Sequence, residues 1–313
     1  MNRLITIVGP TAVGKTELTL RLAENFKSSV ISGDAYQVYK QLNIGTAKPT
    51  REELDRVHHY LIDILEPDDS YSVSVFQSQA KDIIKQCNKQ GMVPILSGGT
   101  GLYVQSLLEN YGFNDVEPNP TLRSQLDELF EREGIDGLRY YAQSLADTYS
   151  LTLELTDKHR LYRAIEMMDS GNISSLQEAR KDGLIYYGPV IGLMRNRDEL
   201  YERINLRVDI MFDQGLLDEV QSLLENGVSP RCQAFKGIGY KEVVAHLEGD
   251  ISFDECKDLI KKNTRHFAKR QITWYKRMPY IQWITIEPGM TGESIYDIVK
   301  QLLAPYDYKI EIN

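Results

Sequence analysis

The residues between Gly9 and Thr16 have the types and spacing of a phosphate-binding loop. The segment matches the pattern G-x-x-x-x-G-K-[ST] and reads Gly9-Pro10-Thr11-Ala12-Val13-Gly14-Lys15-Thr16. In such a loop backbone N–H groups surround a polyphosphate at the positive end of a helix, and the lysine neutralises its oxygens. We therefore expect all eight residues to bind a diphosphate, with the Thr16 hydroxyl as a ligand of Mg²⁺.

The loop alone does not identify the reaction, because ATPases, GTPases, small-molecule kinases and group transferases with diphosphate leaving groups all need one. The sequence has no clear strand of four apolar residues ending in Asp that could hold a second metal ligand. The best candidates are Val30 to Asp34, which Ser32-Gly33 interrupts, and Tyr60 to Asp63. The class of reaction has to be sought elsewhere in the sequence.

A second group of polar residues follows two other predicted strands, at Asp34 and at Gly98-Gly99-Thr100-Gly101-Leu102-Tyr103. The carboxyl ends of parallel strands converge on one crevice, so both should face the phosphate loop. Asp34 could be a general base or a metal ligand, or it could only cap a surface turn. The glycine-rich turn could bind an anion or a base edge, or only join a strand to a helix.

The elements that position these residues alternate between strands and helices. Apolar runs predict strands at 4–8, 30–32, 60–64 and 93–96, while three-to-four spacing predicts helices at 17–26 and 75–90. Such alternation is typical of a parallel α/β sheet. The predicted fold is therefore α/β, a P-loop NTPase-like parallel sheet core with a helical insertion.

The composition of the sequence changes near residue 115, where Gly, Asn and Pro precede about seventy residues with the apolar spacing of helices. A strand then returns at 189–194, and helices follow at 197–226, 239–248 and 254–276. We expect an α/β core with C-terminal basic helices from residues 1–114 and 188–313, and a helical insertion at 115–187. A tandem arrangement of two domains split near residue 115 is the alternative.

The net charge of −9 argues against a wholly basic, non-specific nucleic-acid binder. Lysines and arginines nevertheless gather at 257–277, a segment with eight of them and a single acidic residue, Asp258. The net charge of this segment is therefore +7, and that of the remaining chain is −16. Such a run could bind RNA phosphates, or it could be a solvated amphipathic helix. Three scattered cysteines and no long apolar segment predict a cytoplasmic protein without disulfides, zinc fingers or membrane spans.

The chain resembles the bacterial tRNA dimethylallyltransferases, also called tRNA isopentenyltransferases. The resemblance extends from Gly9 to about Trp283 through seven motifs in order: GPTAVGKT, GDAYQVY, NIGTAKP, GGTGLY, KHRLYRAIE, KGIGYKE and KRQITWYKR. It implies transfer of a dimethylallyl group from dimethylallyl diphosphate to N6 of the adenosine 3′-adjacent to the anticodon of tRNA. It also implies that the phosphate loop holds the prenyl diphosphate rather than ATP, and we expect a monomer.

The family's reaction implies a role for four residues. Loss of the diphosphate requires cations and N–H dipoles at the leaving group, supplied by Lys15, the loop, Mg²⁺ and, by resemblance, Arg207. Arg203 and Arg207 could equally be a solvated charge stripe. Asp34 would accept the proton of the weakly nucleophilic N6 amine, beside Thr100. Ala35 stands where the family usually has serine, so that position carries no hydroxyl.

The resemblance also implies an interface with the tRNA anticodon stem-loop and an extruded base. The residues assigned to it are Asp34, Ala35, Tyr36, Gln37, Thr100, Arg123, His159, Arg160, Arg163, Lys236, Gly239, Tyr240, Lys241, Lys269, Arg270, Gln271, Thr273 and Trp274. His159 could instead be an ordinary helix-surface residue.

Three other functions stay open at this point. A small-molecule P-loop kinase would use Asp34 to activate a hydroxyl, and an isopentenyltransferase could act on free adenine nucleotides. An RNA-binding NTPase switch would bind GTP or ATP without prenyl chemistry. The basic segment argues against the first two, because a mononucleotide does not need it.

Overall fold

The computed structural model describes residues 1–113, 119–171, 173, 183–306 and 308. The chain divides into two compact units, residues 1–109 with 183–313, and residues 110–182. The units therefore divide earlier than the expected boundaries at 115 and 187. Residues 183–187 belong with the sheet because Ile185 N–H donates to the Leu108 carbonyl and Tyr187 N–H to the Asn2 carbonyl.

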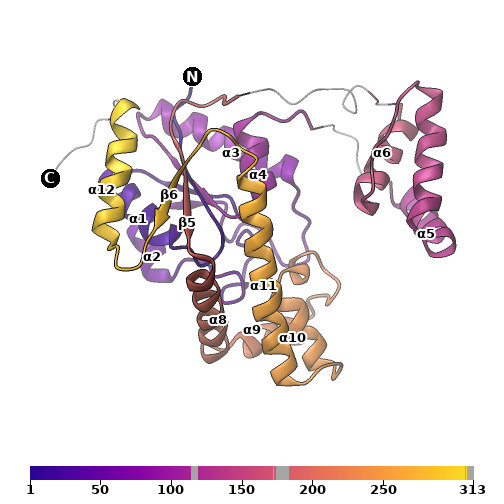
Figure 1. The fold of residues 1–313 in the computed structure, drawn as a ribbon. Helices are drawn as coiled ribbons and strands as arrows, with labels where there is room; N and C mark the ends of the chain where they lie inside the picture. Colours follow the sequence, from indigo (N-terminus) through magenta and orange to yellow (C-terminus); the bar gives the residue numbers. More distant parts are fainter. Residues whose placement is uncertain (114–118, 172, 174–182, 307, 309–313) are drawn as a thin grey trace. The chain divides into compact units, whose positions relative to one another are not determined.

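The first unit contains a six-stranded parallel sheet (Figure 1). Its strands, in spatial order, are β3 (His59–Tyr60), β2 (Val30–Ser32), β4 (Ile95–Gly98), β1 (Ile5–Val8), β5 (Val190–Arg195) and β6 (Ile281–Ile286). Strand β1 lies between β4 and β5, and Val8 is in register with both Gly98 and Gly192. The phosphate loop that follows β1 therefore emerges between the ends of β4 and β5.

Helices cover both faces of the sheet, as the alternation of core residues requires. Ile5 and Ile7 of β1 pack in one hydrophobic cluster, whereas Leu4 and Val8 pack in the other. The helices of this unit are α1 (Lys15–Asn25), α2 (Arg51–Arg56), α3 (Val73–Lys89), α4 (Gly101–Leu108), α8 (Arg197–Asp213), α9 (Leu216–Glu225), α10 (Tyr240–Leu247), α11 (Phe253–Tyr275) and α12 (Gly292–Leu303).

The structure corrects four details of the predicted elements. β3 is shorter than expected and β4 extends to Gly98, so the glycine-rich turn begins inside the sheet. The single helix predicted at 197–226 is two helices, because Gly215 adopts a φ of 95° between α8 and α9. Strand β6 and helix α12 were not predicted from the sequence. Within the described residues, no helix is long and apolar enough to cross a membrane.

The second unit is helical and has its own core. Helix α5 (Pro120–Thr148), which is kinked at Gly134, packs against α6 (Lys158–Asp169). Buried Glu166 organises their polar contacts, because its carboxylate accepts hydrogen bonds from the Asn119 N–H and from Arg123. This unit therefore has a core of its own and an ion pair of its own, between buried Glu166 and half-exposed Arg123.

Candidate functional site

The phosphate loop has the backbone geometry that its sequence predicts. Gly14 adopts a left-handed conformation with φ 110° at the start of α1. Gly9 has φ 149°, and a Cβ there would lie 2.6 Å from the carbonyl oxygen of Leu193. Both positions therefore require glycine. The Lys15 ammonium closes the loop by donating to the carbonyls of Gly9 and Pro10, each at 2.9 Å.

Three arginines bind successive residues of the loop. Arg195 Nε donates to the Val13 carbonyl at 3.0 Å, and Arg203 Nε donates to the Ala12 carbonyl at 2.9 Å. Arg207 Nη1 reaches the Thr11 hydroxyl at 3.4 Å. Arg203 and Arg207 therefore do not form a merely solvent-facing stripe. Arg195 was not among the residues predicted from the sequence, since nothing in its local sequence connects the end of β5 with the loop.

One cavity of about 710 Å³ brings the predicted catalytic residues together. Its lining includes the loop from Thr11 to Thr16, Asp34 to Gln37, Gly98 to Thr100, Arg203, Arg207, Lys236, Tyr240, Lys241, Arg270 and Gln271. All of these belong to the first unit. The cavity thus has cations along one part of its wall and a carboxylate and a hydroxyl along another.

Asp34 lies in a tight turn after β2. Its Oδ1 accepts hydrogen bonds from the N–H groups of Tyr36 at 2.9 Å and Gln37 at 3.3 Å. The Thr100 hydroxyl accepts from the Ala35 N–H at 3.1 Å, which joins this turn to the glycine-rich turn. Asp34 therefore caps a turn and also lines the cavity, so the capping and functional interpretations are compatible.

The cavity shifts the pKa values of its central charged groups. Burial lowers the pKa of Lys15 to about 7; Arg207 adds to this shift and Asp34 opposes it. Burial raises the pKa of the Asp34 carboxyl, against the opposing effects of two backbone hydrogen bonds and of Lys15. Perturbed groups that share a cleft are typical of functional sites.

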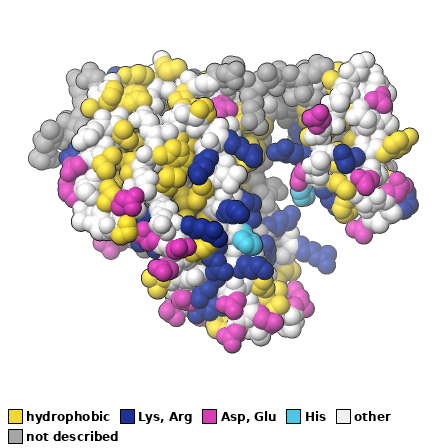
Figure 2. Space-filling view, in the orientation of Figure 1, with side chains coloured by type: hydrophobic (Ala, Val, Ile, Leu, Met, Phe, Trp, Pro, Cys, Tyr) yellow, Lys and Arg dark blue, Asp and Glu magenta, His cyan; other side chains and the backbone are white. Residues whose placement is uncertain are grey.

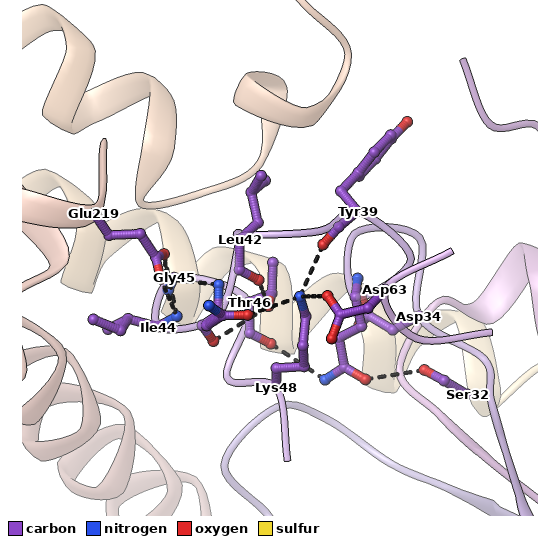
Figure 3. Close-up of polar contacts among 12 residues, drawn as sticks. Ser32, Asp34, Tyr39, Leu42, Ile44, Gly45, Thr46, Lys48, Asp63 and Glu219 are labelled. Carbon is purple, nitrogen blue, oxygen red and sulfur yellow. Dashed lines mark hydrogen bonds and ion pairs between the residues drawn. The ribbon is translucent and has the colours of Figure 1, made fainter. Parts of the chain in front are cut away.

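The segment between Asn43 and Lys48 forms a further wall, which Figure 3 shows beside Asp34. The Glu219 carboxylate of α9 accepts from the backbone N–H groups of Asn43 and Ile44, each at 2.9 Å, and from the Tyr240 hydroxyl at 2.6 Å. Buried Lys48 donates to the Tyr39 carbonyl at 2.8 Å and pairs with Asp63 (Figure 3). Charged side chains from separate elements thus fix this wall.

Several residues expected at a tRNA interface have internal contacts in the structure. The Gln37 amide donates to the carbonyls of Thr46 and Ala47. Tyr240 is fully buried, and Gly239 is buried at the start of α10. Gln271 is 5% exposed. A surface role in RNA binding thus remains a prediction for these residues.

Basic residues also lie at the surface around α11. His266, Lys269, Arg270, Thr273, Trp274 and Arg277 line a groove of about 550 Å³. Figure 2 shows Lys and Arg side chains gathered over this helix, and Lys236 and Lys241 are exposed as well. Lys257 and Lys261, however, both form ion pairs with Asp209. Part of the predicted +7 is therefore neutralised by α8.

The expected RNA contacts of the helical unit lie on α5 and α6. His159 and Arg160 are exposed on α6. Arg123 makes two hydrogen bonds to Glu166, from Nε at 2.7 Å and from Nη2 at 3.1 Å, and Arg163 also faces this carboxylate. Any RNA contact of Arg123 must therefore be made while it is bound to Glu166, or after release from it.

The Thr16 hydroxyl lines the cavity and could supply one ligand of a magnesium ion. Among the described residues, no group of three or more His, Cys, Asp or Glu side chains could hold a metal. Mg²⁺ keeps several waters and commonly binds through few protein ligands together with substrate phosphates. The Thr16 hydroxyl would match that preference if a diphosphate bound beside it.

Comparison with known proteins finds relatives of a single family. The family model described as IPP transferase matches residues 37–278. The chain is 40% identical over 304 residues to a tRNA dimethylallyltransferase of Alkaliphilus metalliredigens, with 96% of each chain covered.

Two solved structures are similar to the chain along nearly its whole length. One is the tRNA isopentenylpyrophosphate transferase of Bacillus halodurans, with 35% identity, a TM-score of 0.73 and 98% of each chain covered. Another is the tRNA delta(2)-isopentenylpyrophosphate transferase of Staphylococcus epidermidis, with 38% identity, a TM-score of 0.70 and coverage of 96% of this chain and 98% of that one. With its phosphate loop, its parallel sheet and these matches along nearly its whole length, the chain belongs to the IPP transferase family.

Proposed function

We propose that this chain transfers a dimethylallyl group from dimethylallyl diphosphate to N6 of the adenosine 3′-adjacent to the anticodon in tRNA, and releases diphosphate. The observation that carries the proposal is the single cavity that contains the phosphate loop, Asp34 and Thr100. The names of its relatives support tRNA as the acceptor. We expect the enzyme to act in the cytoplasm as a monomer.

The leaving group sets the first requirement of the reaction. As the bond between C1 of the prenyl group and the diphosphate oxygen breaks, negative charge grows on the diphosphate. The ammonium of Lys15, the N–H groups of the loop and the guanidinium of Arg207 stabilise that charge. Lys15 now donates to two loop carbonyls, so a bound diphosphate would take over one or both of these hydrogen bonds.

The nucleophile sets the second requirement. The lone pair of the N6 amine is delocalised into the adenine ring, and the nitrogen must lose a proton as its bond to C1 forms. Asp34, held in orientation by two backbone N–H groups, accepts that proton. Thr100 lies beside Asp34 through its contact with Ala35 and would help orient the base.

Mg²⁺, held by Thr16 and the diphosphate, would neutralise part of the leaving-group charge. The protein's own contribution is to fix the Thr16 hydroxyl at the first turn of α1, directly after Lys15. We further propose that Lys236, Lys241, Lys269, Arg270 and Thr273 contact the RNA backbone near the cavity, because they are exposed at its edge or in the adjacent groove. Arg123, His159, Arg160 and Arg163 would contact it from the helical unit.

The decisive experiment incubates the purified chain with dimethylallyl diphosphate, Mg²⁺ and unmodified tRNA, followed by mass analysis of the tRNA nucleosides. We expect one prenylated adenosine, located next to the anticodon by nuclease mapping. Parallel reactions replace tRNA with AMP, or dimethylallyl diphosphate with ATP. Prenylation of AMP alone would favour a nucleotide isopentenyltransferase, and phosphoryl transfer from ATP would favour a kinase. Absence of prenylated tRNA would overturn the proposal.

A further inference from the structure

The side chain of Gln271 connects the two loops that the reaction must hold in alignment. Its Oε1 accepts a hydrogen bond from the Thr11 N–H of the phosphate loop at 2.9 Å. Its Nε2 donates to the Gly99 carbonyl of the glycine-rich turn at 2.8 Å. The residue is 5% exposed, the hydrogen bond to Gly99 is buried, and the one from Thr11 is partly buried at the wall of the cavity.

The fit around this amide is close. A Cβ on Gly99 would lie 2.4 Å from Gln271 Nε2, so the turn carries glycine where the amide approaches its backbone. Gln271 stands in the penultimate turn of α11, far from both loops in sequence. Such a contact between three separate segments is specific to the folded arrangement and is absent from any local motif.

Two neighbouring residues of α11, Trp274 and Tyr275, contact the same glycine-rich turn. The Tyr275 hydroxyl donates to the Gly98 carbonyl at 3.3 Å, and the Trp274 ring lies where a Cβ on Gly101 would clash with it. Residues 271, 274 and 275 share one face of the helix. Of these three contacts, only that of Gln271 also extends to Thr11.

We propose that Gln271 is a positioning residue, which sets the distance between the loop that binds the diphosphate and the turn that carries Thr100. This inference rests on the proposed function. The transferred carbon must lie in line between the leaving oxygen and N6, and a displacement of about 1 Å in such a geometry can lower the rate about 10²-fold. Gln271 spans the two sides of that line without touching the reacting atoms.

The proposal assigns Gln271 a role different from direct contact with RNA. Its amide oxygen and nitrogen both have partners in the folded chain, whereas Lys269, Arg270 and Thr273 of the same helix are exposed. The exposed residues would set the affinity for tRNA. Gln271 would set the rate once both substrates are bound.

The test compares Gln271→Met with Gln271→Glu. Methionine fills a similar volume and removes both hydrogen bonds, while glutamate keeps an acceptor for Thr11 but turns an acceptor toward the Gly99 carbonyl. We expect kcat to fall about 10²-fold in both variants, with KM for dimethylallyl diphosphate and for tRNA within about threefold of the native values. Part of the dimethylallyl diphosphate should then react with water in place of N6, giving dimethylallyl alcohol and diphosphate.

Gln77→Met is the matched control. Gln77 is 6% exposed, and its amide donates to the backbone carbonyl of Ser106 at 2.7 Å, outside the cavity. The variant Gln77→Met should lower the melting temperature about as much as Gln271→Met does, but it should leave kcat unchanged. Equal losses of kcat in Gln271→Met and Gln77→Met would show that Gln271 has only a structural role. A rise in KM for tRNA alone in Gln271→Met would show that Gln271 contacts the RNA. Either result overturns the proposal.

A measurement independent of activity separates this proposal from the proposed function. Hydrogen exchange of the peptide that contains Thr11 should be faster in Gln271→Met than in the native chain or Gln77→Met. Suppose that exchange is faster in Gln271→Met but the native chain transfers no prenyl group. The positioning role of Gln271 would then be supported, and the proposed function would be rejected. If exchange were unchanged in Gln271→Met while the native chain showed prenyl transfer, the positioning role of Gln271 would be rejected and the proposed function kept.

Discussion

Lys15 and Asp34 line the same cavity, and the charge of each partly offsets the effect of burial on the pKa of the other. Burial lowers the pKa of Lys15 to about 7, and the Asp34 carboxylate limits that shift. Burial raises the pKa of Asp34, and the Lys15 ammonium limits that shift in turn. A diphosphate beside Lys15 would favour its ammonium form, which would also help to keep Asp34 ionised and able to accept a proton.

Replacing Asp34 with asparagine tests the general base directly. Asn keeps the size of the side chain and an oxygen for the Tyr36 N–H, but it cannot accept the N6 proton. We expect kcat to fall about 10²- to 10⁴-fold while both substrates still bind. Rapid-quench assays with saturating tRNA and dimethylallyl diphosphate measure it. Asp55→Asn on exposed α2 is the matched control, and a near-normal kcat in Asp34→Asn would remove Asp34 from this role.

Lys15 should make stability depend on pH in a defined direction. Its pKa is about 7 in the folded chain against an ordinary value of 10.5. Between these values the unfolded chain binds a proton that the folded chain does not, so the free energy of unfolding rises with pH. The variant Lys15→Met has no ionisable group at this position, so its free energy of unfolding lacks this dependence on pH. Relative to the native chain, the variant should therefore be most stable near pH 7, and this difference should shrink between pH 7 and pH 10.

Urea unfolding at several pH values measures this difference. Lys85→Met, on an exposed part of α3, is the control and should keep a constant offset from the native chain. If Lys15→Met also showed a constant offset, the pKa of Lys15 would be the same in the folded and the unfolded chain, and burial would not lower it.

Glu219 should stabilise the wall of the cavity through its charge. Glu219→Gln keeps the shape but leaves one amide oxygen for donors that now share a carboxylate, among them Ile44 N–H and the Tyr240 hydroxyl. We expect a loss of about 2 kcal/mol in the free energy of unfolding, as for hydrogen bonds to charged groups. Tyr240→Phe and the double variant complete a cycle, which should give a coupling of about 1 kcal/mol. Glu225→Gln on the same helix serves as the control, and additive effects in the cycle would contradict the contact.

The sequence predicts the parts of this site that local chemistry determines. The phosphate loop follows from the spacing of Gly9, Gly14 and Lys15, and the place of Asp34 follows from the rule that parallel strands end at one edge of the sheet. Five of the six strands and most helices follow from the periodicity of apolar residues. The family follows from motifs spread along the chain.

Contacts between distant segments could not be predicted in this way. Thr11 and Gln271 are 260 positions apart, and no local pattern shows that they meet. Glu219 reads as a surface residue of an amphipathic helix until the fold brings Asn43 to it. The buried position of Tyr240 likewise depends on packing against Phe235, whereas the family resemblance implies an RNA contact for this residue.

Arg207 should act on both the leaving group and Lys15. It lines the cavity, reaches the Thr11 hydroxyl and is the second cause of the lowered pKa of Lys15. Arg207→Gln removes a cation from the developing charge, so we expect kcat to fall about 10²- to 10³-fold. It also removes a repulsion on the Lys15 ammonium, which raises the pKa of that lysine. Binding of inorganic pyrophosphate, which favours the charged lysine, should therefore persist to higher pH in the variant than in the native chain.

Calorimetric titrations with pyrophosphate between pH 6.5 and pH 9.5 separate these two effects of Arg207. Affinity at pH 7 should fall, because one cation is lost, but the pH at which affinity begins to decline should move upward, because Lys15 holds its proton longer. Arg197→Gln, an exposed arginine at the start of the same helix that stacks on Tyr201, controls for the change in net charge. A variant that lost affinity without any shift of the decline would show that Arg207 binds the anion but does not govern the charge of Lys15.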